Sequence, residues 1–476
     1  MITAVRNILL SLMVAFPIHG ATAMESNPSG PNIVLIFVDD LAWVDVGFHG
    51  GAVPTPNIDR LRHAGISFER AYANSPTCSP SRAGLITGRH PAALGFFRHI
   101  GSGENTGIDK FGRTEQSHAM LEADPAQAPS RNWLPLEEVT LAERLKERGY
   151  ATGFVGKWHL GHEPYHPVNQ GFDVQFGVTN AGHPKSYYPP YFSNSDVYAD
   201  ADNDYYLTDR IADDAAALLN DFLKGDDTPF FLSLWFYGVH TPLEGKQERV
   251  EFYIDQGVAE ERANLHAMIE SMDQAIGRVI DMIEEGNKLD DTLIIFASDQ
   301  GGFLETPPLR GRKGGGEALY EGGSRVPLVF HYPKRIPAGI SRVQPVSLID
   351  IVPTVMDLVT GEVPKELHGE SLVSSFMKVP DQEGEVILYR HYEDKFGALI
   401  TPRWKFIASL AGQNELYDLS SDAGEANNLI KDYPEIGMCM ERRFREWVQS
   451  NAAFDPYQHG AQSGEPGNGG NECIKN

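Results

Sequence analysis

Cysteine is scarce in this sequence, with three residues among 476, so the chain is not a small domain held together by disulfides. Long apolar runs are also missing, because no segment reaches the roughly 18–20 residues that a membrane span needs. Positive charge is in deficit: 40 Lys and Arg face 65 Asp and Glu, and the net charge is −25. We therefore expect no nucleic-acid partner, and any anionic substrate must be captured by a local cluster of cations.

The first 23 residues have the pattern of a signal peptide. Arg6 precedes a short apolar run, Ile8–Ile18, and Ala21–Ala23 forms an A-x-A cleavage site. No cysteine follows the apolar run, so we expect no lipoprotein anchor, and we expect the mature chain in the periplasm or outside the cell. In such an oxidising compartment Cys439 and Cys473 could pair, although two free thiols fit the sequence equally well.

Strand-like and helix-like segments alternate through most of the chain. Five apolar runs are typical of buried strands in a parallel sheet, at residues 32–38, 150–155, 230–236, 292–297 and 326–330. Thr55 and Thr140 are N-cap candidates for intervening helices, and apolar side chains recur at helical spacing from 268 to 283. This alternation predicts an α/β fold over residues 24–375, with a large, mostly parallel central sheet sandwiched by helices.

The pattern changes after about residue 376. Four short strand-like segments are separated by turn residues, at 386–390, 397–401, 404–408 and 415–419. A helix is predicted over 434–448, so residues 376–458 should form a small C-terminal subdomain with an antiparallel sheet and a helix. Residues 459–476 are rich in Gly, Ser and Asn, and we expect them to be disordered.

Acidic and amide side chains follow two of the predicted strands. Asp39 and Asp40 come after the first strand, and Asp299 and Gln300 come after the strand at 292–297. Ligands of such folds collect beyond the carboxyl ends of the strands, and oxygen-only ligands favour Ca²⁺ or Mg²⁺ over zinc. A single acidic pair could reflect turn chemistry alone, but two pairs at corresponding strand ends favour a metal site.

Cations and histidines follow the other strand ends. Lys157 and His159 flank Trp158, so in an extended segment both side chains would point to the same side. His240 comes shortly after a buried strand, and Lys313 lies in a glycine-rich loop where the backbone can approach a ligand closely. Each could be a solvated surface group, but their convergence with the carboxylates predicts one site.

Cys78 lies among small polar residues in the run NSPTCSPSRAGLITG, four positions before Arg82. This run resembles the signature C-x-P-x-R with a downstream L-x-x-G of the type I, formylglycine-dependent sulfatases, which belong to the alkaline phosphatase superfamily. The second family signature resembles GYATGFVGKWH at residues 149–159. Further similar motifs are the DD after the first strand, TPNIDRL, SD-x-GG, K…EGG–RVPL and LYDL. The resemblance spans about residues 30–430.

The resemblance implies that Cys78 is oxidised to formylglycine by a formylglycine-generating or anaerobic sulfatase-maturating enzyme. Arg82 would stabilise the aldehyde hydrate. One Ca²⁺ would be bound by Asp39, Asp40, Asp299, Gln300 and the modified Cys78. The sequence departs from the family at Gln300, where Asn or His is usual.

The resemblance also assigns roles to the cations. Lys157, His240 and Lys313 would hold the sulfate and its leaving oxygen. One hydroxyl of the hydrate would attack sulfur, while His240 or Lys313 protonates the departing alcohol. His159 would then deprotonate the second hydroxyl, so that sulfate leaves and the aldehyde is regenerated.

Two loops rich in aromatic and basic residues, 93–107 and 180–192, are expected to shape a sugar pocket, although such loops could equally serve only to cover the site. The candidate substrate-binding residues are Arg98, His99, His183 and His391, beside Lys157, His240 and Lys313. For an exported sulfatase we expect O-sulfate groups on a polysaccharide or oligosaccharide as substrate. The alternatives are a phosphodiesterase or phosphonate monoester hydrolase of the same superfamily, or an arylsulfatase acting on small aryl sulfates. A non-catalytic sugar-binding relative is disfavoured because the reactive positions are retained.

Overall fold

The computed structural model describes residues 30–459 except 102–106, 110–111, 121–127, 194, 200, 226–227, 315, 378–382 and 391–393. The predicted signal peptide, the tail beyond residue 459 and His391 therefore lie outside the described residues. Within them, no helix is long and apolar enough to cross a membrane.

The large sheet is built around the apolar strand β1. Its strands in spatial order are β11 (Ile340–Ser347), β2 (Ile66–Tyr72), β10 (Leu328–His331), β8 (Thr292–Ser298), β1 (Asn32–Val38), β7 (Phe230–Trp235), β5 (Ala151–Gly156) and β6 (Val174–Phe176), and β9 (Arg325–Val326) pairs with β2. β1 runs parallel to both β7 and β8, whereas β10 runs antiparallel to β8 and β2. The predicted mostly parallel sheet is confirmed.

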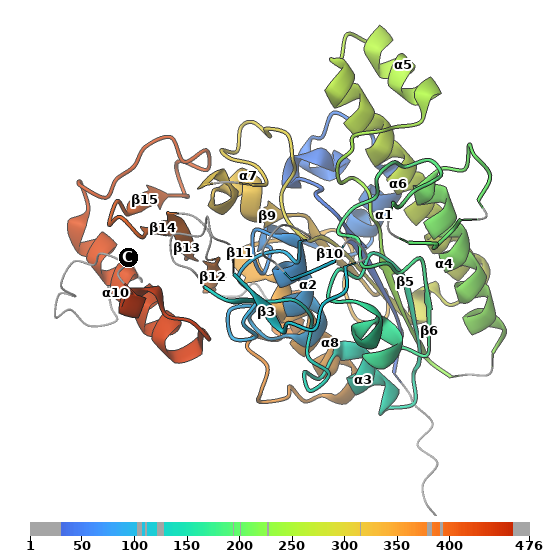
Figure 1. Ribbon diagram of the computed structural model, residues 1–476, viewed down its shortest axis with the longest axis horizontal. Coiled ribbons are helices and arrows are strands. Elements are labelled where there is room, and N and C mark those ends of the chain that lie inside the picture. The colour runs from blue at the N-terminus through green and yellow to red at the C-terminus, as the bar shows by residue number, and fades with distance from the viewer. Residues whose placement is uncertain are drawn as a thin grey trace, which may run out of the picture.

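Helices cover both faces of this sheet (Figure 1). The helices of this part of the chain are α1 (Pro56–His63), α2 (Cys78–Thr87), α3 (Leu141–Lys146), α4 (Leu207–Lys224), α5 (Gln247–Asp255), α6 (Glu260–Glu285), α7 (Glu321–Ser324), α8 (Ile351–Thr360) and α9 (Val373–Met377). Of these, α5 packs on α6 and projects away from the sheet. Successive side chains of β1 point to opposite faces. Leu35 and Phe37 accordingly pack in the core beneath α2, α3 and α8, while Val34 and Ile36 pack with α1, α4 and α6.

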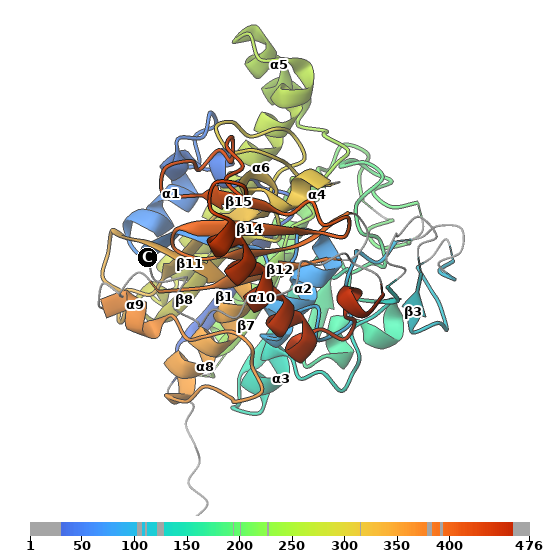
Figure 2. The ribbon, with the colours of Figure 1, turned by 90° about the vertical axis from the view of Figure 1, so that its left-hand side faces the viewer.

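A second sheet lies at the C-terminal end of the chain, at the left of Figure 1 and in front in Figure 2. It is antiparallel and consists of β12 (Val386–Tyr389), β13 (Lys395–Ile400), β14 (Trp404–Ser409) and β15 (Glu415–Asp418). One face packs on α10 (Pro434–Asn451), and the other packs on Tyr72, Leu319 and Tyr320 next to the large sheet. A two-stranded sheet of β3 (His118–Ala119) and β4 (Ser130–Arg131) completes the strands of the described residues.

Among the described cysteines, Cys78 is free and buried, whereas Cys439 in α10 is disulfide-bonded. A disulfide is what an oxidising compartment permits. Cys473 lies outside the described residues.

Candidate active site

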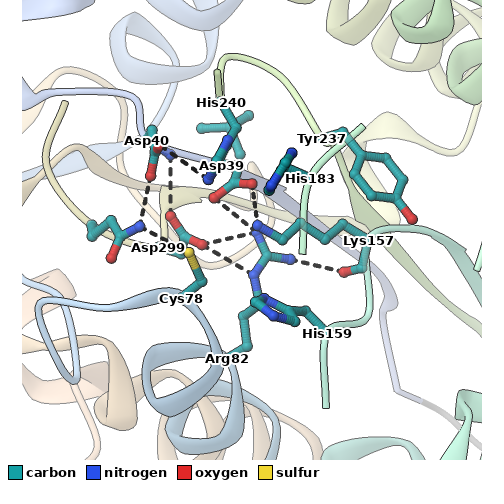
Figure 3. A network of polar contacts seen from close by, with 12 residues as sticks. Asp39, Asp40, Cys78, Arg82, Lys157, His159, His183, Tyr237, His240 and Asp299 are labelled. Atoms are coloured by element: carbon teal, nitrogen blue, oxygen red, sulfur yellow. Dashed lines mark hydrogen bonds and ion pairs between the residues drawn. The ribbon is translucent and has the colours of Figure 1, made fainter. Parts of the chain in front are cut away.

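The candidate site lies beyond the carboxyl ends of four parallel strands (Figure 3). The polar residues after these ends are Asp39 and Asp40 after β1, Lys157 and His159 after β5, His240 after β7, and Asp299 and Gln300 after β8. Backbone hydrogen bonds continue past the strand ends: Asp299 donates from N to Val38 O at 3.0 Å, and Lys157 donates to Trp235 O at 2.8 Å. The sheet register therefore fixes how these side chains converge.

Two site residues have left-handed backbone conformations. Asp40 has φ 62° and His159 has φ 56°, although neither is glycine. Such conformations cost energy for residues with a Cβ and concentrate at functional sites. Each turns the chain sharply after a strand, so that the side chain is aimed into the site instead of continuing the alternation of the sheet.

Cys78 is the first residue of α2 and is 4% exposed. Pro80 occupies the first helical turn, where its missing N–H costs no hydrogen bond, and Gly88 closes the helix with φ 68°. The Cys78 Sγ lies 3.1 Å from Gln300 Nε2 and 3.4 Å from Lys313 Nζ. Although burial opposes the shift, Lys157 and Lys313 lower the pKa of the Cys78 thiol well below its usual value.

Arg82 lies one turn further along α2 and is completely buried. Its Nε and Nη2 donate to Asp299 Oδ2 at 3.0 and 2.9 Å, and its Nη1 donates to Lys157 O at 2.8 Å. Charge-assisted bonds with this two-point geometry fix orientation as well as position. Arg82 therefore ties α2 to the strand ends of β8 and β5.

The carboxylates crowd together in a space that suits a hard cation. Asp39, Asp40, Cys78 and His240 each offer one ligand atom, and these atoms lie within 4.8 Å of one another. Within the described part of the chain, Asp39 Oδ1 and Gln300 Oε1 are buried without a hydrogen-bond partner. Burial and then repulsion from Asp39 raise the pKa of Asp299. Buried oxygens without donors are what a bound cation would satisfy, so these residues fit one.

Two lysines approach the same carboxylates. Lys157 Nζ forms a buried ion pair with Asp39, and Lys313 Nζ lies 2.7 Å from Asp40 Oδ1. Lys313 reaches the site because its loop is held by a hydrogen bond from its own N to Gly302 O at 2.7 Å. Both predicted cations thus face the predicted metal ligands.

The histidines have defined tautomers because each has one nitrogen engaged by a carbonyl. His159 donates from Nε2 to Ile100 O at 2.7 Å, which leaves a lone pair on Nδ1. His240 donates from Nδ1 to Thr241 O at 2.7 Å, and its Nε2 lies 3.7 Å from Asp40 Oδ2. Of the two free nitrogens, His159 Nδ1 is buried without a hydrogen-bond partner among the described residues.

The predicted substrate residues lie in different settings. The His183 ring stacks on His240 with centroids 5.2 Å apart and planes 6° apart. Loss of surrounding water lowers the pKa of His99 to about 4. The nearby Cys78 opposes this shift, and His159 and Lys313 add to it. Arg98 is buried and donates to Ala119 O at 2.5 Å, so it supports its own loop, and its assignment to substrate binding stays a prediction.

The loop at 180–192 lines a cavity of about 740 Å³. Its walls combine the apolar Pro189, Pro190 and Phe192 with polar side chains such as Asn180 and Asp196. Tyr237 was not named from the sequence, although it follows the end of β7 and stands three positions before His240. It lies near Lys157 in Figure 3 and donates to Gly177 O at 3.1 Å.

The family model described as Sulfatase matches residues 31–361, and that of the C-terminal region of N-sulphoglucosamine sulphohydrolase matches residues 317–449. The chain belongs to the sulfatase family. A sulfatase of Formosa agariphila is 27% identical over 94% of this chain and 94% of its own length. The N-acetylgalactosamine-6-sulfatase of Sus scrofa is 29% identical over 76% of this chain and 69% of its own length.

Solved structures share the fold as well. The crystal structure of Ps i-CgsB in complex with k-i-k-neocarrahexaose superimposes with a TM-score of 0.74 at 29% identity, covering 90% of this chain and 94% of that one. The protein is accordingly a sulfuric ester hydrolase.

Proposed function

We propose that this sulfatase hydrolyses O-sulfate groups on a polysaccharide or oligosaccharide, with Cys78 as precursor of the nucleophile. The reaction consumes water and yields a free alcohol, inorganic sulfate and a proton. The observation that carries the proposal is the convergence on Cys78 Sγ of Lys313 at 3.4 Å and Gln300 at 3.1 Å, at the edge of a carboxylate cluster.

Conversion of Cys78 to formylglycine is a two-electron oxidation at Cβ, in which the sulfur leaves as hydrogen sulfide and an oxygen atom takes its place. A formylglycine-generating or anaerobic sulfatase-maturating enzyme would carry it out and supply the oxidant. When formed, the aldehyde hydrate supplies one hydroxyl as nucleophile and a second whose deprotonation expels sulfate. The position suits this use because Cys78 begins a helix, whose N-terminal N–H groups favour negative charge.

One Ca²⁺ would be held by Asp39, Asp40, Asp299 and Gln300, together with the modified residue 78. When bound, it would withdraw charge from a sulfate oxygen and lower the pKa of the attacking hydroxyl. Arg82 keeps Asp299 in place through its two donors. Gln300 would supply a carbonyl oxygen on a longer arm than the usual Asn or His. In the structure its Nε2 donates to Asp40 Oδ1 at 2.6 Å, so the side-chain amide would turn over for Oε1 to face the cation.

Proton transfers fall to the two histidines. His159 is fixed with its Nε2–H on Ile100 O, so Nδ1 is the atom that can accept a proton from the second hydroxyl. His240 keeps its Nδ1–H on Thr241 O, so it acts as an acid in its imidazolium form, in which Nε2 carries the second proton and gives it to the departing alcohol oxygen. Lys157 and Lys313 offset negative charge on the sulfate in the transition state.

Sugar chemistry is supported by the relatives. The cavity beside the 180–192 loop is lined by none of the proposed catalytic or metal-binding residues, so the proposal does not rest on it. The printed names of the relatives include an N-acetylgalactosamine-6-sulfatase and a protein in complex with a neocarrahexaose. Export to the periplasm or outside the cell is consistent with the signal-peptide pattern and the disulfide at Cys439.

The test is sulfate release from a panel of defined algal and animal oligosaccharides, measured by ion chromatography, with Cys78→Ala as the inactive control. We expect release from at least one sulfated glycan and none from the variant. Parallel assays use a sulfate and a phosphate ester of one aryl scaffold. Turnover of phosphate esters alone would overturn the proposal in favour of a phosphohydrolase.

A further inference from the structure

A buried cluster of charges lies outside the candidate active site, between the two sheets. Lys405 Nζ on β14 lies 3.0 Å from Glu321 Oε1 and 2.9 Å from Glu425 Oε1. None of these three residues is more than 1% exposed. Glu321 is the first residue of α7, and its second oxygen accepts from Tyr72 OH at 3.1 Å.

Burying this charge cluster costs free energy of desolvation. Buried charges lose their hydration, so an ion pair of this kind adds little net stability compared with apolar packing of similar volume. Removing one partner alone would leave an unpaired buried charge. The cluster therefore enforces a fixed arrangement of α7 on the C-terminal sheet. Glu425 adds a further contact by accepting a hydrogen bond from the Glu321 backbone N at 2.6 Å. Its own backbone is in the left-handed conformation, with φ 53°.

The short helix α7 touches two loops of the active site. Gly322 donates from N to Arg310 O at 2.6 Å, and Gly301, which follows Gln300, donates to Gly323 O at 3.0 Å. At these contacts the backbones of α7 and the two loops approach too closely to admit a side chain. A Cβ on Gly322 would lie 2.2 Å from Gly311 O, and one on Gly301 would lie 2.1 Å from Gly322 O. The EGG motif is glycine-rich because three backbones meet there.

A second contact holds the Lys313 loop from the other side. Arg310 donates from Nη1 to Tyr417 OH at 3.1 Å and to Glu425 O at 3.2 Å, and its guanidinium lies 3.8 Å from the centre of the Tyr320 ring. Tyr320 in turn donates to Glu415 Oε2 at 2.7 Å. The residues on both sides of Lys313 are thus anchored on the C-terminal sheet.

We propose that Lys405, Glu425 and Arg310 are positioning residues through which the C-terminal sheet sets the place of Lys313 and of the Asp299–Gln300 turn. The proposal rests on the proposed role of Lys313 in holding sulfate. These residues act at a distance, since their contacts run to α7 and the loop backbone. Displacing a charged group in an active site by about 1 Å can cost about 100-fold in rate.

The experiment compares two perturbations of this contact with one matched control in the full-length, matured protein. Arg310→Met removes the loop contact. Lys405→Met with Glu425→Gln removes one positive and one negative charge together, and Glu321 keeps its ion pair with Arg325 at 3.6 Å. Arg403→Met is the control, because Arg403 pairs with Asp418 at 3.0 Å on the same sheet without touching the loop. For each protein we measure kcat/KM, the inhibition constant of inorganic sulfate, the thermal midpoint, and amide hydrogen exchange of the peptide carrying Lys313.

We expect the two perturbed proteins to lose about 10- to 100-fold in kcat/KM and to bind inorganic sulfate correspondingly more weakly. Exchange should rise in the Lys313 peptide while that of β1 and β8 stays unchanged, and the control should match wild type. A lowered thermal midpoint with unchanged sulfate binding, kcat/KM and exchange would show a purely structural cluster and overturn the proposal. If the wild type releases no sulfate at all, the proposed function fails, and exchange of the Lys313 peptide still decides whether the cluster holds the loop.

Discussion

Replacing Arg82 by Met removes a charge that the fold has buried completely. Arg82 gives three hydrogen bonds, two to Asp299 Oδ2 and one to Lys157 O, and its Nη2 lies 3.6 Å from Asp39 Oδ1. Met can still pack against Phe37 and Trp235, whose ring centres lie 5.4 and 5.3 Å from the guanidinium carbon. The variant therefore isolates the loss of charge and hydrogen bonds from the loss of volume.

The expected loss follows from these contacts. Each hydrogen bond to a charged group contributes about 1.5–3 kcal/mol, and the hydration that Arg82 recovers on unfolding offsets part of their sum. Breaking a buried pair from one side typically costs about 3–5 kcal/mol, because the partner stays buried and unpaired. We therefore expect the free energy of unfolding to fall by about 3–5 kcal/mol, and sulfate release to fall with it, since Asp299 loses its orientation.

Urea denaturation followed by tryptophan fluorescence, in chelator, measures this loss. Arg89→Met is the matched control, because Arg89 follows the same helix, is 32% exposed and makes one ion pair with Glu138 at 2.5 Å. Partly exposed pairs contribute about 0–1 kcal/mol. If Arg82→Met lost no more than this control, the reasoning that Arg82 ties α2 to the strand ends would be refuted.

Three further outcomes are expected. Chelation should abolish sulfate release, and Ca²⁺ should restore it where Zn²⁺ does not, because the predicted ligands are oxygens; full recovery with Zn²⁺ alone would contradict this. Burial raises the pKa of Asp350 to about 7, so the folded state binds the carboxyl proton of Asp350 more tightly than the unfolded state does. The contribution of this group to the free energy of unfolding therefore falls as pH rises towards about 7. The stability advantage of wild type over Asp350→Asn should therefore shrink from about pH 5 to about pH 7 in urea titrations, and a constant difference would contradict the shift. His183→Ala should lower kcat/KM more for a sulfated oligosaccharide than for an aryl sulfate, whose leaving group needs no proton, because His183 stacks on His240; equal losses would rule this out.

The central strands of the large sheet could be predicted from the sequence, whereas β2 and the edge strand β11 could not. β1, β7 and β8 are continuous apolar runs because helices cover both of their faces. β2 and β11 were not expected, since polar residues interrupt them: β2 carries Glu69 and Arg70, and β11 is partly exposed at the sheet edge. The antiparallel direction of β10 is set by its connections, and no local pattern encodes it.

The candidate site shows the same division. Asp39, Asp40, Asp299 and Gln300 could be placed together because parallel strands bring their ends to one edge. Lys313 could be named from its motif, but the contact between its loop and the C-terminal region, from Arg310 Nη1 to Glu425 O, could not be predicted. Such long-range contacts join residues far apart in the chain and leave no periodic signal in the sequence.

Mass spectrometry of the peptide carrying residue 78, taken from protein that releases sulfate, tests the central claim most directly. The proposed mechanism predicts that the Cys78 thiol is replaced by an aldehyde or its hydrate in the active fraction. An unmodified cysteine at position 78 in fully active protein would contradict it.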